Sequence, residues 1–394
     1  MKIEPFALER WMTTYEVGAS HDIAESGILP LSTADLLDML PEAERPAALT
    51  RLLELPLGYS EAPGSLKLRS LLAATYRDTG PDEILVTTGA IEANFLLFNQ
   101  LLDVGDHAIV VHPAYQQLQS VPRAISADVS LWEVEHGPTG FAFDLDALER
   151  LVTSRTKLIV VNSPHNPTGA ILSAAEFQRI YAMADAIGAT VLSDEAYRWL
   201  DHAPAGATHG PPPMRDLGPR GVSVGTFSKP FGLPGLRIGW IAGPADLIAR
   251  CWGMRDYVSL SPGKLNDALA VLAFEQKDVI IARSRRIIAQ NLANAETWFA
   301  ENADLASWTP PRAGLLSLLR YSLDLPSLEV ANRLATEEGV MLAPGSAFGY
   351  EGYLRIGVGP APAIFAEGLA RTARWLRQEA ALASHAEADR LAPV

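Results

Sequence analysis

Between Pro81 and Gly243, short apolar segments alternate with longer helix-like segments. This order is typical of a mostly parallel sheet covered by helices. Because ligands of open α/β sheets bind at the carboxyl ends of the strands, we expect the chemistry of this chain at that edge. Five strands are predicted, each ending in a polar residue, at residues 84–88, 108–112, 158–162, 190–194 and 222–226.

The segments outside this block predict a second, smaller lobe that is discontinuous in the sequence. One segment is the N-terminal arm. The other begins with a long helical pattern at residues 279–303. Strand, helix, strand and helix patterns follow it, at 315–319, 328–338, 353–357 and 362–380. We therefore expect the N-terminal arm and the C-terminal segment to form the small lobe together, and the residues between them to form the large lobe.

Charge and cysteine content exclude several classes of function. The chain has 394 residues, with 46 acidic against 32 basic side chains, a formal net charge of −14. Such a balance repels nucleic acids and anionic membrane surfaces, so neither is an expected partner. The single cysteine, Cys251, forms no internal disulfide, and the eight histidines show no paired-ligand spacing, so no metal is expected. Without an apolar leader or a spanning segment, a cytoplasmic location is expected.

Lys229 is the first candidate for a catalytic residue. It follows the last predicted strand, in Gly-Thr-Phe-Ser-Lys-Pro-Phe-Gly-Leu-Pro-Gly-Leu-Arg-Ile-Gly at 225–239. Among the six lysines of the chain it alone combines a strand end with a turn of hydroxyls and glycines. A desolvated lysine eight positions before an arginine suits a Schiff-base nucleophile beside an anion site. The alternative is a solvated lysine without a chemical role.

Three other strand ends carry polar groups. Asp194, in Val-Leu-Ser-Asp-Glu-Ala-Tyr, either faces a cation such as a protonated pyridine nitrogen or caps a helix. In Asn-Ser-Pro-His-Asn-Pro-Thr-Gly at 162–169, two X-Pro steps hold Asn166 outside helical geometry, with its amide free to donate. Gly89, in Thr-Thr-Gly-Ala-Ile-Glu-Ala, opens a helix whose free amides suit a phosphate, although any strand-to-helix crossover needs a similar turn.

In order and spacing, these four elements resemble the fold-type I, class I/II aminotransferases, which use pyridoxal 5'-phosphate (PLP). The resemblance covers nearly the whole chain. It implies an α/β fold whose large domain has a mostly parallel seven-stranded sheet, with a smaller α+β domain. The expected division is 1–44 for the arm and part of the small domain, 45–278 for the PLP-binding domain and 279–394 for the rest of the small domain. A homodimer with shared active sites is also implied.

The resemblance implies a role for each matching residue. Lys229 would form the Schiff base with PLP and shuttle a proton, and Asp194 would pair with the pyridine nitrogen. Asn166 and Tyr197 would contact the phenolic oxygen of the PLP ring. Asn166 would also lie beside the substrate. Tyr115, in His-Pro-Ala-Tyr, would stack on the ring, unless it is an ordinary core aromatic. The expected catalytic residues are thus Lys229, Asp194 and Tyr197.

Anion sites follow from the same resemblance. Arg355, in Tyr-Leu-Arg-Ile-Gly, matches the arginine that grips the substrate α-carboxylate, a task suited to its planar fork. The alternative is an exposed arginine on a strand. The cofactor phosphate would be held by the helix start, by the lysine turn and by a tyrosine from the neighbouring subunit: Gly89, Ala90, Ile91, Thr226, Ser228, Arg237 and Tyr59.

Three flanking segments, 8–11, 22–28 and 255–261, look like the capreomycidine synthase subgroup, which cyclises hydroxylated arginine. Glu9 or Glu25 would then meet a guanidinium or act as an extra base, unless both are solvated or capping side chains. Gly27 would bring bare backbone close to the substrate, unless it is a turn glycine.

Two reactions remain open. Since residues 257–264 hold no arginine for a second carboxylate, a dicarboxylic amino acid is not favoured as substrate. Transamination of another amino acid is the first prediction, and cyclisation or elimination of an arginine derivative is the second. A non-catalytic PLP sensor is less favoured, because such regulators carry a fused DNA-binding domain.

Overall fold

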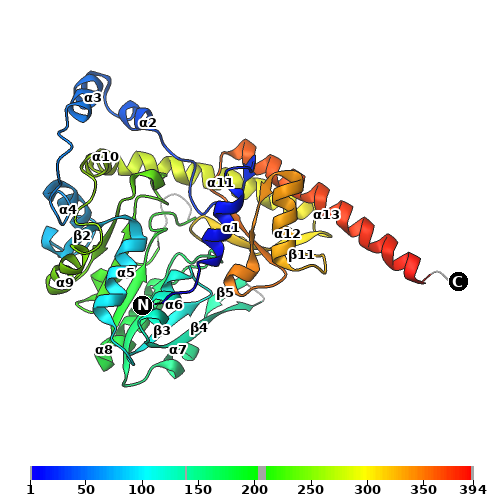
Figure 1. Ribbon diagram of the computed structural model, residues 1–394, viewed down its shortest axis with the longest axis horizontal. Helices are drawn as coiled ribbons and strands as arrows, with labels where there is room; N and C mark the ends of the chain where they lie inside the picture. Colours follow the sequence, from blue (N-terminus) through cyan, green and yellow to red (C-terminus); the bar gives the residue numbers. More distant parts are fainter. Residues whose placement is uncertain (1, 138–139, 203–209, 392–394) are drawn as a thin grey trace.

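The computed structural model describes residues 2–137, 140–202 and 210–391. At its centre lies an eight-stranded sheet in the order β2-β9-β8-β7-β6-β3-β4-β5 (Figure 1). The strands are β2 Ile84–Thr87, β3 His107–His112, β4 Asp128–Gly137, β5 Gly140–Phe143, β6 Thr156–Asn162, β7 Thr190–Asp194, β8 Gly221–Thr226 and β9 Gly239–Ala242. All five strands predicted from the sequence are present.

The sheet is mostly parallel, as expected. Strands β8, β7, β6, β3 and β4 pair in parallel, while β9 is antiparallel to both β8 and β2. The expected number of seven strands is one too low, because β5 pairs with β4 in antiparallel orientation at the edge. Phe141 and Phe143 of β5 are buried against Tyr350 and Trp132, so burial of aromatic side chains stabilises this additional strand.

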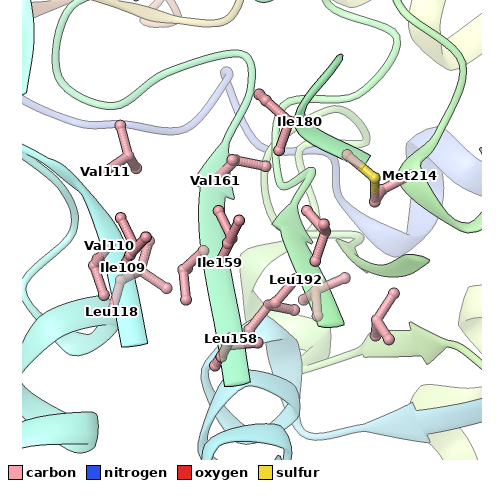
Figure 2. Packing of buried hydrophobic residues seen from close by; sticks show 14 of the residues in the cluster. Ile109, Val110, Val111, Leu118, Leu158, Ile159, Val161, Ile180, Leu192 and Met214 are labelled. Carbon is pink, nitrogen blue, oxygen red and sulfur yellow. The ribbon is translucent and has the colours of Figure 1, made fainter. Parts of the chain in front are cut away.

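Helices cover both faces of the sheet (Figure 1). Strands β2 and β8 are buried along their full length, which explains the near-continuous apolar sequence of β2. Figure 2 shows part of the core, with labelled side chains from β3, β6, β7, α6 and α8: Ile109, Val110, Val111, Leu118, Leu158, Ile159, Val161, Ile180 and Leu192. The helices of this part are α4 Leu66–Ala73, α5 Gly89–Leu101, α6 Gln117–Ala124, α7 Leu145–Leu151, α8 Ala174–Ile187, α9 Ala245–Arg255 and α10 Lys264–Glu275.

A second, four-stranded sheet in the order β10-β11-β14-β13 forms the core of the smaller part. Its strands are β10 Ala306–Trp308, β11 Leu316–Tyr321, β13 Ala343–Pro344 and β14 Tyr353–Gly357. The helices beside it are α11 Lys277–Glu301, α12 Ser327–Arg333 and α13 Pro362–Leu391, the last of which extends away from the body (Figure 1). The predicted helix at 328–338 is α12 followed by a wider turn, and the other predicted elements are present.

The N-terminal arm joins this smaller part although it lies far away in the sequence. Strand β1 (His21–Asp22) pairs in parallel with β12 (Val340–Met341). Helix α1 (Ala7–Tyr15) buries Leu8 and Trp11 in the same apolar cluster as residues of α13. Helices α2 (Thr33–Asp38) and α3 (Arg45–Leu53) then lead to the large sheet. The proposed domain division at residues 44 and 278 stays a prediction.

Candidate active site

A cavity of about 450 Å³ lies at the carboxyl ends of β6, β7 and β8, a volume in the range of small-molecule sites. Most of the residues expected from the sequence line it together: Glu9, Ala90, Ile91, Tyr115, Asn166, Asp194, Tyr197, Thr226, Ser228, Lys229 and Arg237. They come from the arm, from the start of α5 and from the loops after four strands. The fold therefore gathers side chains separated by more than two hundred positions.

Asp194 is buried at the end of β7. Its carboxyl oxygens accept hydrogen bonds from the Asn94 amide at 2.9 Å and from the backbone amide of Ala196 at 3.1 Å. Burial raises the pKa of Asp194, and these bonds together with the charge of Lys229 only partly oppose it. A turn follows β7, so the alternative of a helix N-cap is wrong. The carboxyl group is placed to receive a cation from the cavity.

The amine of Lys229 is held by the N-terminal arm. Its Nζ donates a 2.7 Å hydrogen bond to Ser26 Oγ and lies 3.5 Å from a carboxylate oxygen of Glu25. Because the Lys229 side chain is only 23% exposed, the alternative of a solvated lysine is wrong. Burial raises the pKa of Glu25, but the charges of Lys229 and Arg355 outweigh that effect and lower it. Glu25 is thus a carboxylate facing two cations.

Arg355 lies on β14 and is 2% exposed, so the alternative of an exposed strand arginine is wrong. One terminal nitrogen donates to the carbonyl oxygen of Ala24 at 2.8 Å, and the other to Asn166 Oδ1 at 3.4 Å. Its Nε has no hydrogen-bond partner among the described residues. Burial lowers the pKa of Arg355, while Tyr197 and Glu25 favour its charged form. An unpaired, buried guanidinium nitrogen requires an acceptor.

Tyr115 and Glu9 meet at the mouth of the cavity. The Tyr115 hydroxyl donates to a carboxylate oxygen of Glu9 at 2.8 Å, and the Tyr115 ring packs on Phe6. Burial raises the pKa of Tyr115, and the charge of Glu9 raises it further. Burial also raises the pKa of Tyr197. Both phenols are therefore protonated hydrogen-bond donors at neutral pH.

The start of α5 and the lysine turn form a cup for an anion. The hydroxyl of Thr226 donates to Ser228 Oγ at 3.0 Å. A Cβ added to Gly89 would lie 2.8 Å from a terminal nitrogen of Arg237, so this exposed guanidinium stands directly beside the helix start. A Cβ added to Gly239 would lie 2.6 Å from the backbone nitrogen of Ala90, and the close approach of β9 to α5 therefore requires glycine there.

Two glycines of the Arg355 segment hold the arm in place. A Cβ on Gly357 would lie 2.0 Å from the carbonyl oxygen of Glu25, and one on Gly359 would lie 1.8 Å from that of Gly27. Gly357 also donates a hydrogen bond to the carbonyl oxygen of Ile23. Gly27 is thus buried against backbone at the edge of the site and does not line the cavity.

Tyr59 does not belong to this cavity within one chain. It is 85% exposed in the segment between α3 and α4. Its expected contact with a phosphate of a neighbouring subunit stays a prediction.

Sequence reasoning missed six residues that line the cavity: Ser26, Asn94, Gln117, Asn162, Ala196 and Pro234. Asn94 and Glu92 are the polar side chains among the buried residues of α5, and a polar residue at a buried helix position is a signal that the hydrophobic periodicity of the sequence contains. Ser26 lies in the segment 22–28 and Asn162 in the segment 162–169, both of which the sequence singles out, but only the tertiary structure shows what their side chains contact.

No group of three or more His, Cys, Asp or Glu side chains in the part of the chain that the structure describes is arranged to hold a metal ion. No helix in the described ranges is long and apolar enough to cross a membrane.

Comparisons with known proteins agree on one family. The model of the family "Aminotransferase class I and II" matches residues 26–368. Capreomycidine synthase of Streptomyces vinaceus is 33% identical over 356 residues, which cover 89% of this chain and 88% of the relative. A PLP-dependent aminotransferase from Streptococcus suis 89-1591 superposes with a TM-score of 0.89 at 31% identity, over 96% of this chain and 99% of that one. The PLP-dependent cyclase OrfR superposes with a TM-score of 0.87 at 32% identity, over 96% of this chain and 98% of that one.

Proposed function

Because the chain belongs to the class I and II aminotransferase family, whose solved relatives are PLP-dependent enzymes, we propose that it transfers the amino group of an amino acid that is not dicarboxylic. Lys229 is the residue proposed to bind the cofactor covalently. The observation that carries the proposal is one cavity that Lys229 and the buried Asp194 line together.

The residues of the cavity fit PLP. The buried Asp194 carboxyl group has two hydrogen-bond donors but needs a cation, which the protonated ring nitrogen of the cofactor provides. The amides at the start of α5, the hydroxyls of Thr226 and Ser228 and the guanidinium of Arg237 suit its phosphate. When bound, PLP supplies a ring that accepts the electron pair left at the substrate Cα.

The protein's own groups then bind the substrate and move its protons. Arg355, whose Nε has no partner among the described residues, would hold the α-carboxylate. Asn166 and Tyr197 would hold the cofactor through its phenolic oxygen. Lys229 would move the proton from the Cα of the substrate to C4' of the cofactor, the transfer that leads to a keto acid.

The charges around the cavity support a substrate with a cationic side chain. Glu25 faces only two described cations, Lys229 and Arg355. Once the amine of Lys229 is joined to the cofactor and Arg355 holds a carboxylate, the half-exposed carboxylate of Glu25, whose side chain is 48% exposed, is able to accept a cation in place of water. A guanidinium or ammonium of the substrate side chain provides it, and Glu9 at the mouth of the cavity adds a second acceptor.

A second candidate is cyclisation or elimination of a hydroxylated arginine derivative. The similarity to a capreomycidine synthase and to a PLP-dependent cyclase favours it. The Glu25 carboxylate, 3.5 Å from the Lys229 amine, would serve as the additional base that ring closure by a side-chain nitrogen needs and plain transamination does not.

We also propose that the active unit is a homodimer. Large apolar side chains are exposed in two segments, one before Ser60 and one before Pro262, which a hydrogen bond from Ser60 to the carbonyl oxygen of Pro262 joins: Leu53 77%, Leu57 77%, Tyr59 85%, Tyr257 92% and Val258 54%. Apolar surface of this extent is typical of an interface, and a second copy of the chain covering it would deliver Tyr59 to the neighbouring phosphate cup.

One experiment tests both reactions. Purified holoenzyme is incubated with arginine, 3-hydroxyarginine, lysine, leucine and aspartate, each with and without an α-keto acid acceptor. Amino transfer to the acceptor with formation of the matching keto acid supports transamination. A product formed without acceptor, with loss of water, supports the second candidate. Borohydride reduction followed by peptide mapping must place the cofactor on Lys229, or the proposal fails.

A further inference from the structure

Ser26 connects two reactive groups of the site. Its hydroxyl accepts the hydrogen bond of the Lys229 amine at 2.7 Å, and a second hydrogen bond joins it to the hydroxyl of Tyr197. Lys229 and Tyr197 come from different strand ends of the large sheet, whereas Ser26 comes from the arm. The serine therefore completes a chain of three polar groups that the large sheet alone does not form.

The position of Ser26 is set by the strand that carries Arg355. The residues on either side of Ser26 have their carbonyl oxygens packed on Gly357 and Gly359, where no Cβ fits. Leu29, three residues further on, donates its amide hydrogen to the carbonyl oxygen of Gly359. With close packing on both sides, Ser26 cannot shift without displacing the end of β14.

We propose that Ser26 is a positioning residue for the free amine of Lys229, with Glu25 as the counter-ion of that amine. The inference rests on Lys229 being the reactive lysine of the proposed function. When a substrate amine has replaced it on the cofactor, the amine of Lys229 is free to donate this hydrogen bond to Ser26. Ser26 then keeps the amine beside Tyr197 and the Cα of the substrate, and the carboxylate of Glu25 balances the proton that the amine has accepted.

The link to Arg355 gives this contact a further consequence. A substrate whose carboxylate binds Arg355 fixes the end of β14, and through Gly357 and Gly359 it fixes the arm segment that bears Ser26. Binding of the α-carboxylate and placement of the proton-carrying amine are thus coupled through one short piece of backbone.

The test compares Ser26→Ala, Ser26→Thr and Glu25→Gln with the control Ser20→Ala, which removes a hydroxyl from the same arm outside the cavity. In the holoenzyme, Ser26→Ala is expected to lower kcat about tenfold with KM changed less than about twofold, because one hydrogen bond to a charged group is lost after binding. Ser26→Thr keeps the hydroxyl and is expected to restore most of kcat.

A second measurement does not depend on the reaction. In the full-length chain without cofactor, acetic anhydride labelling of Lys229 is followed by mass spectrometry, with Lys67 and Lys277 as internal references. Ser26→Ala and Glu25→Gln are expected to raise the relative labelling rate of Lys229 about threefold or more, since a held, ion-paired amine reacts slowly. Equal labelling in Ser26→Ala, Ser20→Ala and the unaltered protein overturns the inference. If labelling changes as expected but borohydride maps the cofactor elsewhere, the proposed function fails instead.

Discussion

The buried carboxyl group of Asp194 accepts a 2.9 Å hydrogen bond from the side-chain amide of Asn94, on α5. This bond favours the charged form of Asp194 against the burial that opposes it. Asn94→Ala is therefore expected to weaken PLP binding about three- to tenfold, because the variant loses one hydrogen bond to a charged group. Equilibrium titration of the cofactor-free protein measures this. Asn99→Ala, one turn further along α5, is the control, and equal affinities of both variants would contradict the prediction.

Arg355 is expected to determine substrate affinity. Arg355→Lys loses the planar fork that reaches Ala24 and Asn166 at once, so we expect KM for the amino acid to rise about 10- to 100-fold with a smaller change in kcat. Arg320→Lys, on the exposed side of the neighbouring strand β11, should leave both constants unchanged. An unchanged KM in Arg355→Lys would show that the carboxylate binds elsewhere.

Glu25 is expected to select the side-chain charge of the substrate. In Glu25→Gln, the ratio of kcat/KM for arginine to that for leucine should fall about tenfold, because the remaining amide carries no charge. Glu16→Gln, at the exposed end of α1, serves as control. Since the charges of Lys229 and Arg355 lower the pKa of Glu25, the carboxylate stays charged between pH 7 and 5, and the preference should persist over that range. A ratio that is the same in both variants speaks against a cationic substrate.

His165 is expected to make the stability of the protein fall in mild acid. It is buried between Thr168 and the carbonyl oxygen of Pro113, and burial lowers its pKa to about 4. The unfolded chain takes up a proton at this residue near pH 6.5 and the folded chain only near pH 4. The free energy of unfolding therefore decreases as the pH falls from 6.5 to 4, by up to about 3 kcal/mol from this residue.

Chemical unfolding at several pH values checks the prediction. His165→Asn should lose a large part of the pH dependence between 6.5 and 4.5, whatever its stability at pH 7. His385→Gln, exposed on α13, should keep the slope of the unaltered protein. Identical slopes in all three proteins would rule out His165 as the source.

The proposed homodimer depends on the exposed apolar surface around Tyr257, which is 92% exposed in the single chain. Tyr257→Glu places a charge there and is expected to shift the protein toward monomer, as measured by light scattering after size exclusion. If Tyr59 of one copy reaches the other copy's cup, this variant should also bind PLP at least about fivefold less tightly. Val279→Glu, at another half-exposed apolar position, is the control. A variant that stays dimeric with unchanged affinity would place the interface elsewhere.

The sequence was sufficient to predict elements whose pattern is local. The strands ending at Asn162, Asp194 and Thr226 were predicted because each is a short buried run followed by polar turn residues. Since parallel strands share one carboxyl edge, the meeting of their end residues in one cavity followed as well.

Other features depend on contacts that no local pattern contains. The hydrogen bond from Asn94 to Asp194 spans one hundred positions. Strand β5 packs Phe141 against the ring of Tyr350, which lies more than two hundred positions later. The place of Ser26 depends on two glycines more than three hundred residues later, which look like ordinary strand-end glycines in the sequence.

The pairing of β1 with β12, and the seating of the arm on Gly357 and Gly359, also set an order of assembly during synthesis. A ribosome that has released the large sheet has already completed the cup and the lysine turn, but residues 21–27 of the arm still lack β12, Gly357 and Gly359, on which they pack. Those residues come to rest only after the last strands have emerged. A nascent chain is thus able to bury its main core early, while the amine of Lys229 lacks its contact with Ser26 until translation is nearly finished.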